Sequence, residues 1–260
     1  MLRRSVALLA LLPALFHLAN PAFAQAPNWA KVRVGVEGNY PPFSLLKADG
    51  TLSGFDIDIA RALCAEMKAE CTLVQQEWDG MMPALNARKF DMVVASMTIS
   101  DERRKAAEFS DPYYSVPSRF IARAGTFANH DPATFKGKKI VVLRNSPRAQ
   151  HLAAQYPGSP VLLVAKETDV YLELAAGRAD IGFGSSVVAS DAFLKKPEGK
   201  GYSTVGTPIN LDGGGGVGIA FRKGDAALRD KVNAALKAMR ADGRYKALAA
   251  KYFDFDISPN

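Results

Sequence analysis

The sequence predicts an α/β protein in which strands and helices alternate along the chain. Residues 31–36 (KVRVGV) alternate apolar and polar side chains, as a strand does when one face lies on a core. The next apolar pattern repeats every four residues, at Phe55, Ile59, Leu63 and Met67, and defines one face of a helix. Because the order of strand and then helix recurs to the end of the chain, we expect sheets covered by helices.

The remaining elements continue this alternation. In the first half we expect strands over residues 72–75 and 90–96, and helices over 80–87 and 100–107. A second block has expected strands over 118–123, 139–143 and 179–183, and expected helices over 147–155, 168–176 and 186–194. After the glycine run 213–216, we expect a strand over 217–222 and helices over 226–239 and 244–252.

The N-terminus has the pattern of a secretory signal peptide over residues 1–24. It begins MLRR, is apolar from Val6 to about Leu18, and reads Ala-Phe-Ala at 22–24 before Gln25. A basic start, a short apolar run and a small-x-small site are the parts of such a peptide. The apolar run is too short for a membrane anchor, and the residue directly after the cleavage site is Gln25, not a cysteine that could carry a lipid. We therefore expect an exported, soluble protein. The alternative, a buried N-terminal helix, would show a polar face.

The composition without this leader is that of an ordinary globular protein. About 236 residues suffice for two lobes, and the 48% hydrophobic and 23% charged residues of the full 260-residue sequence are typical values. The formal charge of +7 falls to near +5 without Arg3 and Arg4. Charges are scattered and no nucleic-acid motif accompanies them, so we expect no nucleic-acid partner. The glycine run lacks the strand–GxGxxG–helix context of a dinucleotide site, and we expect a turn there.

The two cysteines, Cys64 and Cys71, are expected to form a disulfide. An even pair in an exported protein usually does so. Cys64 comes late in a helical pattern and Cys71 just before a strand-like one, so the bond would join the helix end to the next strand. Two reduced, buried thiols are the alternative.

Six short motifs are spread along this scaffold: residues 39–43 (NYPPF), 54–58 (GFDID), 78–80 (WDG), 96–100 (SMTIS) with Arg103, 109–113 (FSDPY) and 252–254 (YFD). Together they resemble bacterial periplasmic solute-binding proteins for polar amino acids, above all the lysine/arginine/ornithine- and histidine-binding group of ABC importers. The resemblance covers essentially the whole chain after the leader. The cysteine pair also falls where that group has its disulfide.

The resemblance implies a type II periplasmic binding protein, with a ligand cleft between two lobes joined by two hinge strands. Lobe 1 would be discontinuous, built from residues 27–114 and 213–260, and lobe 2 would span residues 118–209. The chain would cross near 114–118 and return near 209–213, and the cleft would close by a hinge motion. The resemblance also implies a periplasmic monomer that serves an inner-membrane ABC permease, with no cofactor and no metal.

A buried amino acid needs a partner for its carboxylate, its ammonium and its side chain. Arg103 is the candidate clamp for the carboxylate, because a guanidinium forks onto two oxygens; a solvated helix charge is the alternative. Ser96, Met97 and Thr98 follow a buried strand at its carboxyl end, where α/β sheets bind ligands. By the resemblance, the Met97 carbonyl and the Thr98 hydroxyl would take the ammonium.

The turn from Leu143 through Ser146 to Arg148 precedes a helix and offers a second anion contact through its free N–H groups. Pro147 departs from the family pattern, because it removes one of those donors. Arg148 either replaces the lost donor or is solvated, and the sequence leaves both readings open.

Tyr40 and Trp78 resemble aromatic walls that sandwich a ligand side chain, with residence in the core as the alternative. Glu37 ends the first strand and would face a cationic head group. Two further positions depart from the family: Ala95 stands where Ser is frequent, and Ser185 stands where binders of basic amino acids usually carry the Asp that pairs with the ammonium.

These residues predict the binding of a cationic amino acid: arginine, ornithine, lysine or histidine. A first alternative is an opine, because Glu37, Trp78 and Ala95 also look like those of opine binders, and Arg144 or Arg148 would suit an additional carboxylate. A lower alternative is an enzyme like cyclohexadienyl dehydratase, which shares the fold. That chemistry needs an acid to protonate a leaving hydroxyl, and no nucleophile triad or metal spacing is present, so we expect no enzyme.

Overall fold

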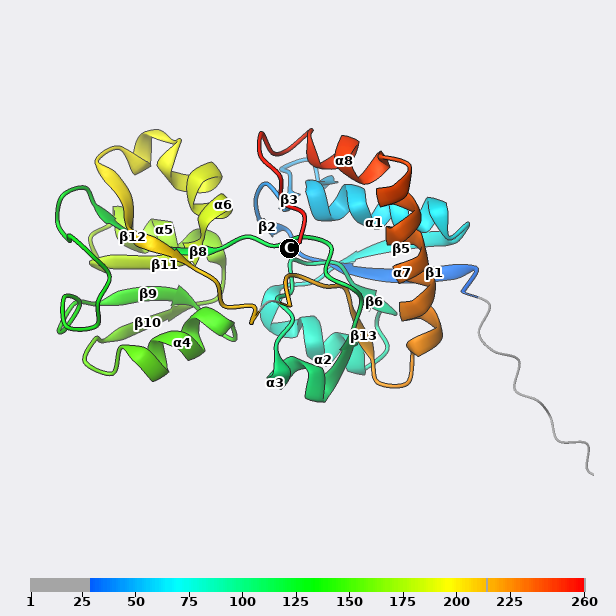
Figure 1. The fold of residues 1–260 in the computed structure, drawn as a ribbon, viewed down its shortest axis with the longest axis horizontal. Helices are drawn as coiled ribbons and strands as arrows, with labels where there is room; N and C mark the ends of the chain where they lie inside the picture. Colours follow the sequence, from blue (N-terminus) through cyan, green and yellow to red (C-terminus); the bar gives the residue numbers. More distant parts are fainter. Residues whose placement is uncertain (1–28, 214, 260) are drawn as a thin grey trace, which may run out of the picture.

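The protein consists of two α/β lobes that lie side by side (Figure 1). The structure is a computed structural model that describes residues 29–213 and 215–259, so the expected signal peptide lies outside it. Each lobe is built on one five-stranded sheet, which confirms the predicted fold class. Among the described residues, no helix is long and apolar enough to cross a membrane.

Lobe 1 is built on strands from both ends of the chain. Its sheet has the order β5 (Glu70–Gln75), β1 (Lys31–Val36), β6 (Met92–Val93), β13 (Ala220–Arg222) and β7 (Ala107–Phe109). β1 pairs in parallel with β5 and β6, while β13 pairs antiparallel with β6 and β7. A small sheet of β2 (Asn39–Tyr40), β3 (Ser44–Leu46) and β4 (Leu52–Ser53) lies beside it.

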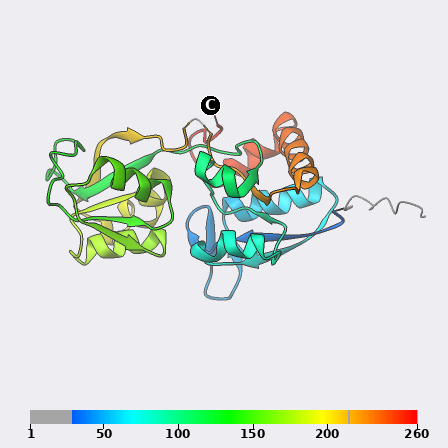
Figure 2. The ribbon, with the colours of Figure 1, turned by 90° about the horizontal axis from the view of Figure 1, so that it is seen from below.

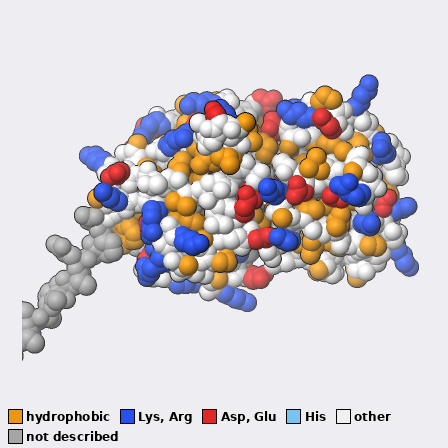
Figure 3. Space-filling view, turned by 180° about the vertical axis from the view of Figure 1, so that it is seen from behind, with side chains coloured by type: hydrophobic (Ala, Val, Ile, Leu, Met, Phe, Trp, Pro, Cys, Tyr) orange, Lys and Arg blue, Asp and Glu red, His pale blue; other side chains and the backbone are white. Residues whose placement is uncertain are grey.

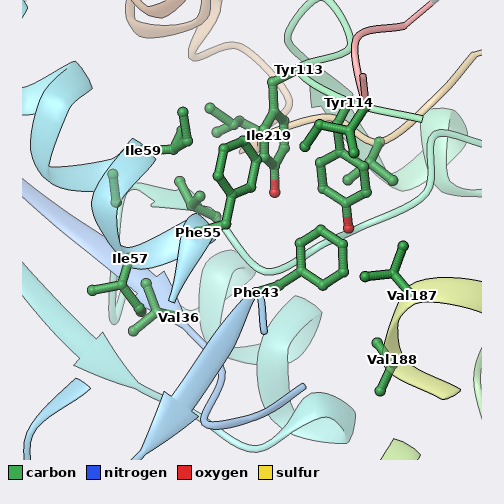
Figure 4. Packing of buried hydrophobic residues seen from close by; sticks show 14 of the residues in the cluster. Val36, Phe43, Phe55, Ile57, Ile59, Tyr113, Tyr114, Val187, Val188 and Ile219 are labelled. Atoms are coloured by element: carbon green, nitrogen blue, oxygen red, sulfur yellow. The ribbon is translucent and has the colours of Figure 1, made fainter. Parts of the chain in front are cut away.

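Helices surround this sheet. They are α1 (Phe55–Glu66), the 3-10 turn η1 (Trp78–Gly80), α2 (Met81–Asn86), α3 (Asp101–Ala106), α7 (Ala226–Ala241) and α8 (Arg244–Ala249). Side chains of α1, α2, α7 and α8 are buried in the core, whereas η1 and α3 have no buried residue. Aromatic rings fill the centre of the core (Figure 4): Phe43 stacks on Tyr114 at 4.7 Å, and Phe55 meets Tyr114 edge-on at 6.1 Å. The predicted Cys64–Cys71 disulfide is present and joins the end of α1 to β5.

Lobe 2 is continuous in sequence. Its sheet has the order β10 (Val161–Val164), β9 (Ile140–Leu143), β11 (Ile181–Ser185), β8 (Ser118–Arg123) and β12 (Tyr202–Ile209). Its helices are α4 (Pro147–Gln155), α5 (Glu167–Ala175) and α6 (Ser186–Ala189), followed by a π turn (Ser190–Leu194) and a 3-10 turn (Pro197–Gly199). Phe120 and Phe183 stack at 4.1 Å in the core between sheet and helices.

Two extended segments connect the lobes along one edge of the molecule (Figure 2). One leads from β7 to β8 and the other returns from β12 to β13. They are joined where Val217 N donates to Tyr114 O at 2.8 Å. Ser115 N, on the first segment, also donates to Ile257 O near the C-terminus at 2.9 Å.

Several elements differ from the prediction. The strand expected over 90–96 is only two residues long, Met92–Val93, and the backbone at Ser96 has a positive φ of 52° that no continued strand would have. The helix expected over 186–194 changes from α to π after Ala189. β10 and β12 were not predicted: both are edge strands, and β12 (YSTVGTPI) is mostly polar, with a Gly and a Pro.

Candidate ligand-binding site

A narrow cavity lies between the lobes and is lined by both. Lobe 1 contributes Glu37, Tyr40, Trp78, Ala95, Ser96, Thr98 and Arg103, and lobe 2 contributes Leu143, Ser146, Pro147, Arg148 and Glu167. The volume of the cavity is only about 20 Å³, which is room for one water molecule and too small for an amino acid in this arrangement of the lobes. Eleven of the thirteen ligand-binding residues expected from the sequence line this cavity.

The other two expected residues lie outside this cavity. Ser185 lines an adjoining one, which shares Tyr40, Thr98 and Arg148 with the first. Met97 is 1% exposed within the lobe 1 core, and its carbonyl accepts a hydrogen bond from Gly218 N at 3.0 Å. The carbonyl that was expected to accept from the ligand's ammonium therefore already accepts a hydrogen bond within the protein.

Arg103 reaches across the cleft rather than into solvent. Ser100 Oγ caps α3 by accepting from Arg103 N at 3.3 Å, which sets the start of the helix. The guanidinium donates to Thr98 O at 2.9 Å and to Asn145 O of lobe 2 at 3.0 Å, and it lies 5.1 Å from the Trp78 ring centroid. Burial and the Arg148 charge lower the pKa of Arg103 to about 10. An anion beside it would relieve both effects.

Arg148 is buried, so it is not the solvated side chain that the sequence left open as one of two readings. Its Nη2 donates to Glu167 Oε2 at 2.8 Å. Burial, the largest single effect, would lower the pKa of Arg148, but the charges of Glu167, Tyr40 and Tyr171 together with a hydrogen bond to Tyr40 outweigh it, and the pKa is raised. The other Glu167 oxygen, Oε1, accepts from Ser185 N at 2.9 Å.

Glu167 is the cleft residue that the sequence did not reveal. It is 1% exposed and occupies the first turn of α5, directly after β10. Since α/β sheets bind ligands at the carboxyl ends of their strands, identification of β10 would have placed Glu167 at the cleft.

Glu37 follows the last residue of β1 and is 4% exposed. Burial raises its pKa to about 8, and the charges of Glu77 and Glu167 add to the effect. Lys166 opposes it, and this lysine is ion-paired with Glu77 across the cleft at 3.8 Å. A cation beside Glu37 would favour its charged form.

The helix that begins at Pro147 satisfies its own first turn. Ser146 Oγ accepts from Ala149 N at 3.2 Å and donates to Leu143 O. Pro147 has no N–H. Fewer backbone donors therefore remain for an anion at this helix start than the sequence prediction assumed.

The remaining polar residues of lobe 1 also have internal partners. Ser96 Oγ donates to Asp56 Oδ2 at 2.7 Å, and Tyr113 Oη donates to Asp56 Oδ1 at 2.7 Å. Trp78 Nε1 donates to Arg144 O at 3.2 Å, so this ring is a wall of the cleft as well as a neighbour of the core. Burial raises the pKa of Tyr40 to about 12, so it stays neutral beside Arg148.

Direct polar contacts join the two lobes along the cleft. Asp79 of lobe 1 accepts from Arg144 Nε at 2.6 Å and from Asn145 Nδ2 at 2.6 Å. On the face in Figure 3, acidic and basic side chains lie next to each other along the middle of the molecule. In the part of the chain that the structure covers, no group of three or more His, Cys, Asp or Glu side chains could hold a metal ion.

Two α/β lobes around a cleft with charged groups on both walls define a two-lobed solute-binding protein. Residues 32–255 match the model of the bacterial extracellular solute-binding proteins, family 3, and the chain belongs to this family.

Proteins similar to this chain are named as binders of cationic amino acids. The chain is 46% identical to the L-arginine-binding protein of Pseudomonas aeruginosa, over 94% of this chain and 95% of the relative. It is 36% identical to the lysine/arginine/ornithine-binding periplasmic protein of Escherichia coli, over 98% and 99% of the two chains. A solved structure of an ancestral arginine-binding protein bound to arginine superimposes with a TM-score of 0.79, at 34% identity over 86% of this chain and 98% of the other.

Proposed function

We propose that this protein binds a cationic amino acid, arginine foremost, in the periplasm and delivers it to an inner-membrane ABC importer. The observation that carries the proposal is that one cavity wall presents both basic side chains, Arg103 and Arg148, and acidic side chains, Glu37 and Glu167. An amino acid with a cationic side chain carries groups of both signs, so it can find a partner of opposite charge for each of them. The names of the similar proteins support the same ligand class.

The proposed ligand contacts side chains of both signs. Arg103 forks onto the α-carboxylate, and Glu37 pairs with the cationic head group. Tyr40 and Trp78 flank the side chain between them. A desolvated cation over an aromatic ring contributes roughly 1–2 kcal/mol. Each of the two shifted pKa values, of Arg103 and of Glu37, returns toward its ordinary range when such a ligand is present.

We also propose that the hinge lies near residues 114–118 and 209–213. This assignment is supported by the two connecting segments, which run between β7 and β8 and between β12 and β13. Lobe 1 would then comprise residues 27–114 and 213–260, and lobe 2 residues 118–209. A hinge there lets the lobes separate without breaking either sheet.

The test is calorimetric titration of the protein, produced from Gln25, with arginine, ornithine, lysine, histidine, glutamine, octopine and nopaline. We expect arginine to bind, with glutamine weaker because it lacks a cationic head group. Binding of none of the cationic ligands would overturn the proposal. Incubation with prephenate is the control for the enzyme alternative, and we expect prephenate to remain unchanged.

A second candidate ligand is an arginine derivative with a substituent on its α-nitrogen, such as an opine. The observation that favours it is the adjoining cavity beside Ser185, which extends toward Tyr114 and Leu211. A substituent that leaves the first cavity past Tyr40 and Arg148 would enter this space. Binding of octopine or nopaline without binding of arginine would select this candidate.

A further inference from the structure

The first cavity contains two acidic side chains among its described lining residues, Glu37 and Glu167. They lie in different surroundings. Glu37 follows β1 of lobe 1, whereas Glu167 belongs to lobe 2 and accepts from Arg148 Nη2 at 2.8 Å. Arg103 and Arg148 line the same cavity, and we call the part that they form its basic end. Because of its direct contact with Arg148, Glu167 is the acid at the basic end of the cleft.

Residues of lobe 2 hold the Glu167 carboxylate in place. Oε1 of Glu167 accepts from Ser185 N at 2.9 Å and from Tyr171 Oη at 3.5 Å. Gly184 leaves room for it, because a Cβ at Gly184 would lie 2.8 Å from the same oxygen. Held in this way, Glu167 can exchange its charged partner with little movement of its own.

The α-carbon of an amino acid carries its carboxylate and its ammonium together, so the partners of these two groups must be neighbours. With the carboxylate on Arg103, the ammonium falls at the basic end of the cleft, where it needs an acceptor once water is excluded. Glu37 is engaged with the far end of the ligand. Glu167 is the remaining acidic side chain on the described cavity wall.

We propose, on the basis of the function proposed above, that Glu167 is the acceptor of the ligand's α-ammonium. The ligand inserts between Arg148 and Glu167: its ammonium takes the place of the Arg148 guanidinium on Glu167, and Arg148 turns to its carboxylate. No proton is transferred in this exchange, and every charge keeps a partner of opposite sign. Glu167 is thus a specificity residue for α-amino acids, as distinct from other molecules with a guanidinium group.

The test compares L-arginine with 5-guanidinopentanoic acid, which is arginine without its α-amino group. Both are titrated into the wild-type protein and into Glu167→Gln. We expect the wild type to prefer arginine by about 10- to 100-fold, the range for a hydrogen bond between charged groups. Glu167→Gln should reduce that preference to about 3-fold or less, chiefly through weaker binding of arginine.

The matched control is Glu173→Gln. Glu173 lies on the same helix but is paired with Arg178 within lobe 2, so this variant should keep the wild-type preference. Equal loss of affinity for both ligands in Glu167→Gln would overturn the inference, since Glu167 would then only hold Arg148. Failure of the wild type to bind arginine would instead overturn the proposed function.

Removal of one partner of a buried ion pair can prevent folding. If Glu167→Gln does not fold, the double variant Arg148→Gln/Glu167→Gln leaves neither charge unpaired, and the ratio of the two affinities is measured on it. A preference for arginine that persists at the wild-type level in the double variant would contradict the inference.

Discussion

Asp79 of lobe 1 and Arg144 of lobe 2 form an ion pair across the cleft, with Arg144 Nε 2.6 Å from Asp79 Oδ2. The other oxygen of Asp79 accepts from Asn145 Nδ2, and Trp78 donates to the Arg144 carbonyl. These contacts link the lobes directly, so they stabilise the closed arrangement whichever ligand the cleft holds. They join one turn of each lobe.

Asp79→Asn should shorten the lifetime of the arginine complex. Because the pair is partly exposed, we expect dissociation to become faster by only about 2- to 5-fold, with association unchanged. Stopped-flow tryptophan fluorescence measures both rates. Arg178→Gln, which breaks an ion pair confined to lobe 2, is the control. Slower association with an unchanged dissociation rate would contradict a role in holding the lobes together.

Arg103→Lys tests the carboxylate clamp while keeping the positive charge. A lysine presents a single donor group where the guanidinium forks onto two oxygens, so the affinity for arginine should fall by about 10- to 100-fold. Agmatine, which lacks the carboxylate, should bind both proteins with similar affinity. If titration calorimetry shows the same loss for arginine and agmatine, Arg103 does not recognise the carboxylate.

Glu37 should make ligand binding dependent on pH. Its pKa is raised from 4.5 to about 8, so between these values the folded protein holds a proton that the unfolded chain has lost. Its contribution to the free energy of unfolding is therefore present at low pH and declines as the pH rises toward 8. A bound cation favours the charged form, so arginine should bind more tightly as the pH rises from 6 to 8, with release of a proton.

Calorimetry at several pH values, in buffers of different ionisation enthalpy, measures both the affinity and the proton release. Glu37→Gln should bind arginine weakly, with no proton release and a flat pH profile. It should also raise the melting temperature of the protein without arginine near pH 8, because a buried carboxylate is removed. A pH profile that is unchanged in Glu37→Gln would assign the dependence to another group.

The disulfide should stabilise the fold without affecting recognition. The cysteines are seven residues apart, and the closure of so short a loop contributes roughly 2–3 kcal/mol. Cys64→Ala/Cys71→Ala should therefore lower the free energy of unfolding by about that amount. Its affinity for arginine should be unchanged, since the bond lies at the end of α1, away from the cleft-lining residues. Urea denaturation and calorimetry test the two statements separately.

The lobe 1 side of the cleft could be predicted because its residues belong to local patterns. Glu37 directly follows an alternating strand, and Arg103 follows a serine that caps its helix. Even there the pattern was incomplete: apolar residues 90–96 predict one strand, but only Met92 and Val93 form it, and Ser96, which lines the cleft, has a positive φ. A local left-handed residue leaves little trace in periodicity.

The lobe 2 side of the cleft was harder to predict from the sequence, because the contacts that define it join residues distant in sequence. Glu167 follows an edge strand of four apolar residues, too short to be identified by period alone. The partnership of Asp79 with Arg144 spans 65 residues and exists only where the two lobes meet. Arg148 is buried against Glu167. Because the strand β10 before Glu167 was not predicted, neither partner of this ion pair could be placed from the sequence.

The position of β13 has a consequence for the order in which the chain can assemble. This strand pairs with β6 on one side and with β7 on the other, where Ala220 lies opposite Phe109. It nevertheless begins 111 positions after β7 ends, because all of lobe 2 lies between the two strands in the sequence. During synthesis from the N-terminus, the strands of lobe 2 are all made before β13 exists. Lobe 2 can thus complete its sheet first, while a chain stopped before residue 220 leaves β6 and β7 without the strand that joins them.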